Sequence, residues 1–395
     1  MFFKKWFRKP SVKAVEYEPS THQFDVRKVD KNAVKVLKQL SQSGYDAYVV
    51  GGSIRDQLMN IHSKDCDVVT NAKPEKVARL IKKSIVVGRR FRIAHARFGR
   101  DIIEIATYRS SAQSKKRKVS SQGIIKRDNI YGTIDEDVMR RDFTINALYF
   151  RYTDGHILDF VGGMEDLINK RLVSIGDPET RFPEDPVRMM RAFRFAAKLS
   201  LSIEDNILTA VEHHKNLLRE ISGQRLFAEL IKLYYSGHAS ASNQLLIEYG
   251  VLEVLIPELS KMKSKDSATL LWQVMADSAD MRFKQGKKLS IVYLFACLYW
   301  PLFMSELAKK RMRHFSIQIA NQVLQNAIFE IPARIKEDIL EIWALQLQFK
   351  GKEKSSQKVL RSKRLRAGYE LLCQRATVDP RLADLGLYWS EFVHE

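Results

Sequence analysis

The chain has 395 residues, of which 45% are hydrophobic and 28% charged, an ordinary composition for a soluble globular protein of roughly two to four domains. Its three cysteines, Cys66, Cys297 and Cys373, lie far apart, which argues against a disulfide framework and a zinc site and suits a reducing cytoplasm. The 66 basic against 46 acidic residues give a net charge of +20, which favours a polyanionic partner, nucleic acid before an anionic membrane, over a merely soluble basic protein.

The first third of the chain alternates between helix and strand signals. Residues 1–25 are basic and aromatic at the start and lack the apolar stretch of a secretory signal, so we expect a loosely ordered extension. Apolar residues at helical spacing predict a helix over 31–43, and Ser53 is placed to cap the next one. Strands are expected between and after these helices, at 45–50, 65–70, 84–88, 91–98 and 101–108.

The rest of the chain is mostly helical in pattern. The Ser-rich, basic residues 110–123 show no apolar period, so we expect a mobile loop there. The apolar segment 289–304 is too short and Pro-interrupted to span a bilayer comfortably, and we expect a buried helix. The predicted fold class is α+β, a mixed-sheet head followed by an all-helical neck, body and tail, with segments 1–25, 26–150, 151–265 and 266–395.

Two glycines separate the strand at 45–50 from the helix that follows. Glycine lets a phosphate approach the backbone, the amides of a helix start point toward it, and Arg55 one turn later adds positive charge. Gly52 and Arg55 are therefore candidate phosphate contacts. A tight strand-to-helix turn is the commoner reason for such a pair, and this alternative stays open.

Asp65 and Asp67 flank Cys66 in a predicted strand. Because side chains alternate along a strand, the two aspartates share one face and Cys66 points to the opposite, packed face. Two carboxylates on one face repel unless a cation lies between them, and such hard oxygen ligands suit Mg²⁺. Glu104 interrupts the apolar strand at 101–108 and is a candidate third ligand, although a salt bridge to an arginine is the alternative.

Residues 136–148 combine acids and two arginines with an apolar run that we interpret as a helix. In a purely structural segment, Asp142 would cap this helix and Arg141 would be solvated. In a nucleotide site, Arg141 would hold a triphosphate and Asp142 would assist at the metal or the ribose.

The clearest helix signal covers 184–199. Asp185 is a natural N-cap with Pro186 at the first helical position, and Arg188, Arg191 and Arg194 step by three along a basic stripe. An Asp beside an Arg one turn on can accept from the amino group and donate to the ring nitrogen of adenine or cytosine, a pattern that guanine and uracil reverse. A solvated basic face is the alternative.

Seven stretches, in this order, resemble one family, the class II nucleotidyltransferases of the polymerase-β superfamily. The similarity covers about residues 30 to 260, and each motif alone is modest while the ordered set is specific. The stretches are VGGSIRD, KDCDVVT, VGRRFRIAH, IIEIATYR, RRDFTINAL, DFVGGMEDL and EDPVRMMRAFRFAAKL.

The resemblance implies a role for each matching residue. Gly52 and Arg55 match triphosphate contacts, and Asp65 and Asp67 match the ligands of Mg²⁺. Asp142 matches a residue treated as catalytic in the bacterial poly(A) polymerase branch, and Glu104 looks like the third strand carboxylate; which of the two completes the metal site stays open. The family's nucleotide-binding positions are matched by Arg141, Asp185, Arg188, Arg191 and Arg194.

The stretches that flank these motifs resemble the poly(A) polymerase branch of the family more than the branch that adds CCA to tRNA. The resemblance therefore implies template-independent addition of AMP from ATP to RNA 3′ ends, with a two-metal Mg²⁺ site. A CCA-adding tRNA nucleotidyltransferase is the first alternative, and a non-catalytic RNA-binding protein on a transferase scaffold is the second.

The expected partners follow from this activity. They are RNA 3′ ends and ATP, with no DNA, in the cytoplasm. RNA-decay proteins are a further candidate, as is a membrane surface for the basic aromatic start MFFKKWFRKP.

Overall fold

The computed structural model describes residues 13–61, 66–88, 92–110, 118–119, 125–127, 130–262, 265–349 and 357–393. These residues form two compact units. The first runs to Asp185 and also includes Leu201–Ala210, and the second consists of Pro186–Ser200 and the chain from Val211 onward. The four predicted segments, with boundaries at 25, 150 and 265, stay a prediction.

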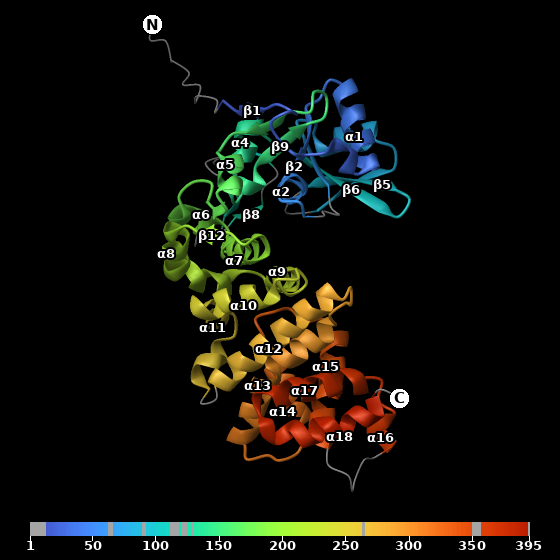
Figure 1. The fold of residues 1–395 in the computed structure, drawn as a ribbon, viewed down its shortest axis with the longest axis vertical. Helices are drawn as coiled ribbons and strands as arrows, with labels where there is room; N and C mark the ends of the chain where they lie inside the picture. The colour runs from blue at the N-terminus through green and yellow to red at the C-terminus, as the bar shows by residue number, and fades with distance from the viewer. Residues whose placement is uncertain are drawn as a thin grey trace. The chain divides into compact units, whose positions relative to one another are not determined.

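The first unit is built on a mixed sheet that has eight strands among the described residues (Figure 1). Its strand order is β1-β10-β9-β2-β3-β6-β5-β4, in which β3 and β6 run parallel and the other neighbours antiparallel. The strands are β1 (Val15–Tyr17), β2 (Ala47–Val50), β3 (Asp67–Thr70), β4 (Ser84–Val87), β5 (Ile93–Phe98), β6 (Asp101–Thr107), β9 (Leu148–Arg151) and β10 (Ile157–Asp159).

Helices α1 (Lys31–Gln42) and α3 (Pro74–Leu80) cover one face of this sheet. Asp30 caps α1 and accepts hydrogen bonds from the first-turn amides of Asn32 and Ala33, which fixes the start of the helix. The helix buries Ala33, Val36, Leu37 and Leu40, whose spacing puts them on one side. On the facing side of the sheet, Val68 and Ile105 are fully buried.

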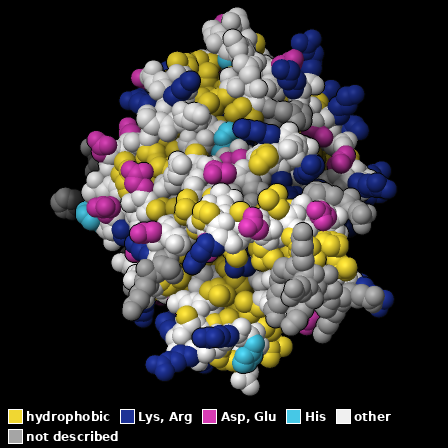
Figure 2. Space-filling view, turned by 60° about the horizontal axis from the view of Figure 1, so that its bottom comes forward, with side chains coloured by type: hydrophobic (Ala, Val, Ile, Leu, Met, Phe, Trp, Pro, Cys, Tyr) yellow, Lys and Arg dark blue, Asp and Glu magenta, His cyan; other side chains and the backbone are white. Residues whose placement is uncertain are grey.

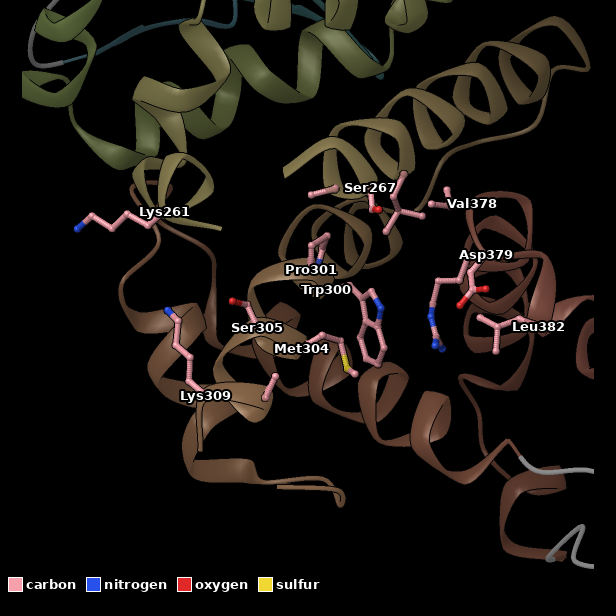
Figure 3. A pocket seen from close by; sticks show the side chains of 14 residues that line it. Lys261, Ser267, Trp300, Pro301, Met304, Ser305, Lys309, Val378, Asp379 and Leu382 are labelled. Carbon is pink, nitrogen blue, oxygen red and sulfur yellow. The ribbon is translucent and has the colours of Figure 1, made fainter. Parts of the chain in front are cut away.

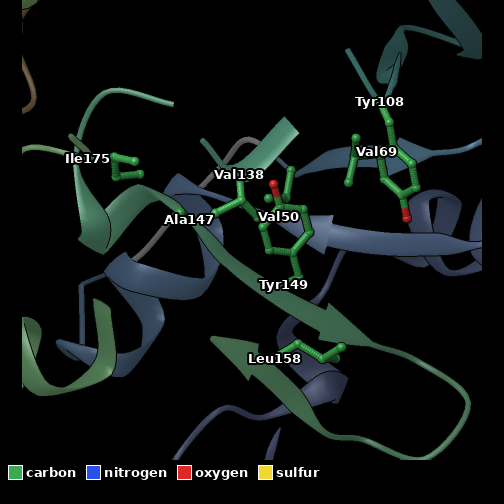
Figure 4. Close-up of a cluster of buried hydrophobic side chains, with 8 residues drawn as sticks. All are labelled: Val50, Val69, Tyr108, Val138, Ala147, Tyr149, Leu158 and Ile175. Atoms are coloured by element: carbon green, nitrogen blue, oxygen red, sulfur yellow. The ribbon is translucent and has the colours of Figure 1, made fainter. Parts of the chain in front are cut away.

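A second hydrophobic cluster lies on the opposite face (Figure 4). It joins the end of β2 to α4 (Ile134–Val138), whose start is fixed by a capping box between Thr133 and Glu136. Helix α2 (Gly52–Leu58) leaves β2 directly beside it. The cluster consists of Val50, Val69, Tyr108, Val138, Ala147, Tyr149, Leu158 and Ile175. It therefore lies under the strand ends that carry the nucleotide motifs.

The helix expected after Asp142 is wrong. A short 3₁₀ turn, η2 (Thr144–Asn146), is followed at once by β9. The apolar run belongs to a strand because β9 pairs with both β2 and β10 and is buried on both faces.

Two other local expectations also differ from the structure. Ser53 does not cap α2, because the helix begins at Gly52 with Gly51 in the N-cap position. Most of 110–123 lies outside the described residues, and its described part contributes β7 (Lys118–Val119), which pairs with β8 (Ile125–Arg127), where a loop was expected. In the segment expected as an extension, Val15–Tyr17 form the edge strand β1.

The connection out of the head contains two short helices and a two-stranded pair. These are α5 (Gly163–Ile168), α6 (Pro178–Glu184), β11 (Arg171–Leu172) and β12 (Ser202–Ile203). The 3₁₀ helices of the described chain other than η2 are η1 (Val26–Lys28), η3 (Lys215–Glu220), η4 (Pro257–Lys261) and η5 (Pro380–Leu382).

Beyond Asp185 the described chain is almost entirely helical, as the sequence predicts. Neighbouring helices pack in the pairs α7–α10, α10–α12, α13–α15, α15–α17 and α17–α18. The helices are α7 (Val187–Leu199), α8 (Asp205–His214), α9 (Gly223–Tyr234), α10 (Ala239–Glu248), α11 (Val251–Leu255), α12 (Lys265–Lys284), α13 (Ile291–Lys309), α14 (Ile317–Gln325), α15 (Ala333–Gln348), α16 (Gln357–Leu360), α17 (Leu365–Val378) and α18 (Ala383–Val393).

Helix α13 is the core helix of the second unit, which confirms the buried helix expected over 289–304. By length and composition it is the one helix in the described part of the chain that could cross a membrane, yet 61% of its most apolar window is buried inside the protein. The indoles of Trp272 and Trp343 donate hydrogen bonds to its backbone at Leu298 O and Ala296 O, over 2.9 and 3.0 Å. These bonds satisfy two polar groups that the core would otherwise leave unpaired.

Candidate active site

The Gly-Gly turn connects β2 to α2. Gly51 has φ 76° and ψ −129°, a conformation that residues with a Cβ rarely adopt, so the turn itself requires glycine there. Gly52 is the first residue of α2, and an added Cβ would meet Arg55 Nη2 at 3.4 Å. The backbone conformation of the turn therefore requires the first glycine, while the second leaves space beside Arg55 at the start of the helix.

Arg55 is almost fully buried, with 3% of its surface exposed. Its Nε donates to Asp56 Oδ1 over 2.8 Å, and its Nη1 donates to Asn146 Oδ1. The Asn146 amide in turn donates to Asp142 Oδ1 over 3.0 Å. Arg55 and Asp142, which belong to different motifs, are therefore connected through one asparagine.

Arg141 lies in the bend between α4 and η2 and is only partly exposed. Its Nε donates to the Tyr149 hydroxyl over 2.8 Å, and its Nη2 donates to Asp137 Oδ2 over 3.2 Å. Tyr149 donates to the same Asp137 oxygen over 3.0 Å. Burial alone would lower the pKa of Arg141, but its contacts with Tyr149 and Asp137 outweigh burial and hold that pKa above the ordinary value. The site thus holds a fixed, permanently charged guanidinium.

Arg181 of α6 supports the same loop from the other side. Its Nη2 donates to the carbonyl of Arg141 over 2.9 Å and its Nε to the carbonyl of Ile175 over 3.1 Å. It also pairs with Glu184. The segment that leads to Asp185 is therefore hydrogen-bonded to the backbone of Arg141.

The DFVGGMEDL stretch acts as a scaffold for this loop. The carboxylate of Asp159 accepts from four consecutive amides, at residues 161 to 164, over 2.9 to 3.1 Å and so caps α5. A Cβ added to Gly163 would lie 2.3 Å from the carbonyl oxygen of Thr144, and the Thr144 hydroxyl donates to Asp166 over 2.8 Å. Close packing at Gly163 therefore fixes the position of the 3₁₀ turn that carries Asn146.

Two of the predicted metal ligands, Asp67 and Glu104, fall on β3 and β6. Asp65 lies outside the described residues, and Asp67 is the exposed first residue of β3. The parallel register of Val68 with Ile105 aligns Asp67 with Glu104 on one face of the sheet. Glu104 is also exposed, and its Oε1 lies 3.5 Å from His95 Nε2 across the β5–β6 pair, where an arginine was the expected alternative.

This pair of carboxylates fits a divalent cation in chemical type. Asp67 and Glu104 are exposed oxygen donors on adjacent strands, the kind of ligand that Mg²⁺ prefers. No group of three or more His, Cys, Asp or Glu side chains placed to hold a metal occurs among the described residues, a set that omits Asp65. The ligand set stays a prediction.

Cys66 directly precedes β3 and is partly buried. Its thiol interacts with Asp30, the capping residue of α1, and burial together with Asp67 and Asp30 raises its pKa to about 12. A thiol with such a pKa is protonated at neutral pH and is a poor metal ligand or nucleophile. The position of Cys66 on the face opposite Asp67 stays a prediction.

The predicted base-reading residues are divided between the two units. Asp185 ends α6 in the first, and Arg188, Arg191 and Arg194 lie on α7 in the second. Helix α7 begins at Val187 with Pro186 at the N-cap, so the expected cap at Asp185 is wrong by one residue.

The arginines of α7 do not form a solvated stripe. Arg188 is only 8% exposed, whereas an arginine on a solvated face would be mostly exposed. The guanidinium carbons of Arg191 and Arg194 lie 5.1 and 4.3 Å from the centroid of the Phe195 ring. The solvated-face alternative is therefore wrong at Arg188, while the nucleotide-binding roles stay predictions.

Sequence reasoning missed the residues that hold the motif side chains in place. A single Asn or Tyr inside an apolar run has no periodic signal, and a buried acid beside an arginine is recognised only from contacts. A signal was available at Asp56, because an acid directly after an arginine expected at a binding site indicates a partner for that arginine. The missed residues are Asp56, Asp137, Asn146, Tyr149 and Arg181.

Comparisons with known families agree with this geometry. The chain matches the family described as "Poly A polymerase head domain" over residues 47–173. It also matches "Probable RNA and SrmB- binding site of polymerase A" over 200–263 and "Polymerase A arginine-rich C-terminus" over 316–395. The three matches follow one another from the head to the C-terminal helices.

Similar proteins and solved structures point the same way. The Poly(A) polymerase I of Salmonella typhi is 38% identical, with 94% of this chain and 84% of that protein covered, and that of Escherichia coli O157:H7 is 37% identical, with 97% and 86% covered. A CCA-adding enzyme of Lactobacillus helveticus is 38% identical over only 56% of this chain and 55% of that protein. The structure of the Bacillus stearothermophilus CCA-adding enzyme in complex with CTP has a TM-score of 0.66 at 23% identity, covers 92% of this chain and 81% of that chain, and supports the fold. The chain therefore belongs to the poly(A) polymerase I family of nucleotidyltransferases.

Proposed function

We propose that the chain carries out template-independent polyadenylation of RNA 3′ ends with Asp65 and Asp67 as its metal ligands. As a member of the poly(A) polymerase I family it is a nucleotidyltransferase that joins AMP from ATP to RNA and releases pyrophosphate. The observation that carries the activity is the similarity to Poly(A) polymerase I along 94% of the chain, where the CCA-adding relative matches 56%.

The reaction is a displacement at phosphorus. The RNA 3′ oxygen attacks the α-phosphorus of ATP, a new P–O bond forms, and the bond to the oxygen that bridges to the β-phosphate breaks. The proton of the 3′-OH is lost, and pyrophosphate leaves.

Divalent metal ions serve this family generally, and we propose Mg²⁺ here. Bound Mg²⁺ would favour the ionised 3′ oxygen and neutralise charge on the leaving pyrophosphate. Asp67 suits the role because pairing of its strand to Val50 fixes its backbone while its side chain stays exposed. Asp65 would be the second ligand, and Glu104 or Asp142 the third.

We assign the triphosphate to the Gly-Gly turn and the two arginines beside it. The amides at the start of α2, at Gly52, would donate to phosphate oxygens, as helix N-termini commonly do. The support for Arg141 is its fixed position between Tyr149 and Asp137. Arg55 would add positive charge at the same turn.

Base selection would rest on Asp185 and Arg188, with Arg191 and Arg194 adding charge along α7. An acceptor beside a donor suits adenine and cytosine alike, so this pair explains rejection of guanine and uracil and not the choice between A and C. The match of residues 200–263 to an RNA-binding family supports RNA contacts by the helical unit. A cytoplasmic location and RNA-decay proteins as partners agree with this role. A membrane surface that binds the basic aromatic start of the chain is the alternative partner.

The metal ligands can be tested with a matched control. Asp101, like Asp67, is an exposed aspartate at the first position of a strand in the same sheet. We expect Asp65→Ala and Asp67→Asn to lower RNA extension by about a hundredfold or more, because charge on the pyrophosphate is no longer neutralised. Asp101→Asn should retain wild-type extension, measured on a short labelled RNA with ATP and Mg²⁺.

The same variants distinguish an enzyme from a binding module. RNA binding, measured by fluorescence anisotropy without ATP, should stay near the wild-type value in all three. Extension by Asp67→Asn at the level of Asp101→Asn would refute the metal assignment.

A further inference from the structure

A cavity of about 690 Å³ lies within the second unit, between α12, α13 and the C-terminal end of α17 (Figure 3). One wall is apolar, with Leu271, Pro301 and Met304, and Ser267 and Ser305 add hydroxyl groups. All of the residues that line it belong to the helical unit, so it is separate from the site residues of the head. Its volume falls within the roughly 300–1,000 Å³ typical of ligand sites.

Arg375 is the charged group that distinguishes this cavity. Its guanidinium carbon lies 4.6 Å from the centroid of the Trp300 ring, and its Nη1 donates to Gln346 Oε1 over 2.9 Å. The acidic residue in the lining, Asp379, pairs instead with Arg381 over 2.8 Å. Burial lowers the pKa of Arg375 to about 10, with Asp379 offsetting only part of this, as expected for a cation that lacks enough negative charge nearby.

The position of Arg375 is fixed by aromatic packing. Trp300 is only 4% exposed and packs against Phe303 and Trp343, with ring centroids 5.8 and 6.5 Å away. The guanidinium therefore rests on a rigid platform, and little side-chain entropy is lost when it binds an anion.

The two lysines of the lining lie on the opposite side of the cavity from Asp379 and Leu382 (Figure 3). Lys261 is exposed and lines the cavity, whereas Lys309 is offset by Glu306, 2.6 Å from its Nζ. An apolar wall next to a fixed cation fits a ligand with one flat apolar part and one anionic part. A nucleotide has this composition, and a cavity of this size admits one nucleotide and no duplex.

We propose that this cavity binds one unpaired nucleotide of the RNA substrate, with its phosphate at Arg375 and its base against the apolar wall. This inference rests on the proposed function, which makes RNA the substrate. The bound nucleotide is a second one, in addition to the 3′-terminal nucleotide that reacts in the head. A free nucleotide such as ATP has the same chemistry, and the experiment separates the two sources.

The test is the Kd of a fluorescein-labelled oligo(A) RNA, measured by anisotropy without ATP or Mg²⁺. Arg375→Leu removes the cation, and Ser305→Trp fills the cavity while keeping every charge. We expect each to weaken binding about tenfold, the scale of a lost nucleotide contact. Arg334→Leu is the matched control, because Arg334 is an exposed arginine of the same unit outside the cavity, and it should bind like wild type.

Salt dependence adds a readout that a packing defect does not reproduce. Loss of one phosphate contact should reduce the slope of log Kd against log salt by about 0.7 in Arg375→Leu. Arg375→Lys should restore the slope, and Ser305→Trp should show the same reduced slope as Arg375→Leu because the phosphate can no longer reach the cation. Thermal unfolding confirms that each variant is folded, and Arg375→Leu with its Lys rescue decides the matter if Ser305→Trp does not fold.

Two results would overturn the proposal. If Arg375→Leu and Ser305→Trp bind RNA like Arg334→Leu, the cavity does not hold RNA, and an acidic peptide becomes the better partner. If they bind RNA normally but lose a measured ATP-binding event, the cavity holds the free nucleotide. Because binding needs no catalysis, absence of RNA extension would contradict the proposed function and leave this test intact.

Discussion

Asn146 connects two charged residues that belong to different motifs, Arg55 and Asp142. Its amide accepts from buried Arg55 and donates to Asp142 over 3.0 Å. A buried guanidinium needs such partners, because removal of one leaves a charge that is costly to keep away from water. The RRDFTINAL motif therefore supplies two proposed functional residues and the residue that orients one of them.

The raised pKa of the Cys66 thiol predicts how the stability of the protein changes with pH, and this tests whether Cys66 is a packed, protonated thiol. Burial, Asp67 and Asp30 raise the pKa of its thiol from 9.0 to about 12. Between these values the unfolded thiol ionises while the folded one stays protonated, so stability falls as the pH rises through this range. Cys66→Ser lacks this titration. We therefore expect the stability advantage of wild type over Cys66→Ser to shrink between about pH 8 and pH 10, measured by urea unfolding.

The same variant tests whether Cys66 takes part in catalysis. At about pH 8, Cys66→Ser should extend RNA nearly as well as wild type, because the protonated thiol has no role at the metal. Loss of extension comparable to that of Asp67→Asn, or a stability gap that widens with pH, would contradict the packing role.

For single residues, the sequence predicted the charged residues of the motifs but not the residues that hold them in place by hydrogen bonds. Alternation along a strand predicted one face for Asp65 and Asp67, and the apolar run around Glu104 marked it as a candidate third ligand. The register of β3 with β6 then aligns Asp67 with Glu104 on one face, which is a tertiary contact that the sequence alone does not give. Asn146 accepts from Arg55, 91 residues away in the chain, and no local rule describes such a contact. The role of Asp65 stays a prediction.

At the scale of elements, α5 and the 3₁₀ turn behave as one scaffold. Gly163 lets the start of α5 approach the carbonyl of Thr144 more closely than any side chain allows, since an added Cβ would lie 2.3 Å away. The DFVGGMEDL motif therefore has a structural role.

Gly163→Ala tests this scaffold. We expect a loss of about 1–3 kcal/mol in the free energy of unfolding, because the backbone must move to relieve the clash. RNA extension should fall as well, since the displaced turn carries Asn146. Gly386→Ala is the control: no atom lies within 4 Å of its added Cβ, and it sits in α18, where alanine should stabilise by up to about 1 kcal/mol. Urea unfolding that shows equal stability for the two variants would contradict the role of Gly163.

The elements themselves were largely predictable from periodicity. Strands β2 to β6 and helices α1 and α13 lie where alternation or helical spacing indicated. The run after Asp142 was misread because a short, uninterrupted apolar segment fits a buried helix and a buried strand equally well. Pairing of β9 with β2 and β10 decides for the strand, and that pairing is a tertiary contact.

For the whole molecule, charge and the order of its parts agree with action on RNA. The chain carries a net charge of +20, and Figure 2 shows lysine and arginine side chains across the face in view, with acidic ones among them. Such a distribution favours sequence-tolerant contact with a polyanion that weakens as salt rises. The head carries the proposed metal and phosphate residues, and the helical unit carries the arginines of α7.

The most direct test of this account is the choice of nucleotide and the length of the product. Purified protein is given Mg²⁺ and each NTP in turn, on a short unstructured RNA and on a tRNA that lacks its CCA end. We expect a long ladder with ATP on the short RNA and no comparable ladder with CTP, GTP or UTP. A product that stops after C-C-A on the tRNA, with little extension of the short RNA, would contradict polyadenylation and identify a CCA-adding enzyme.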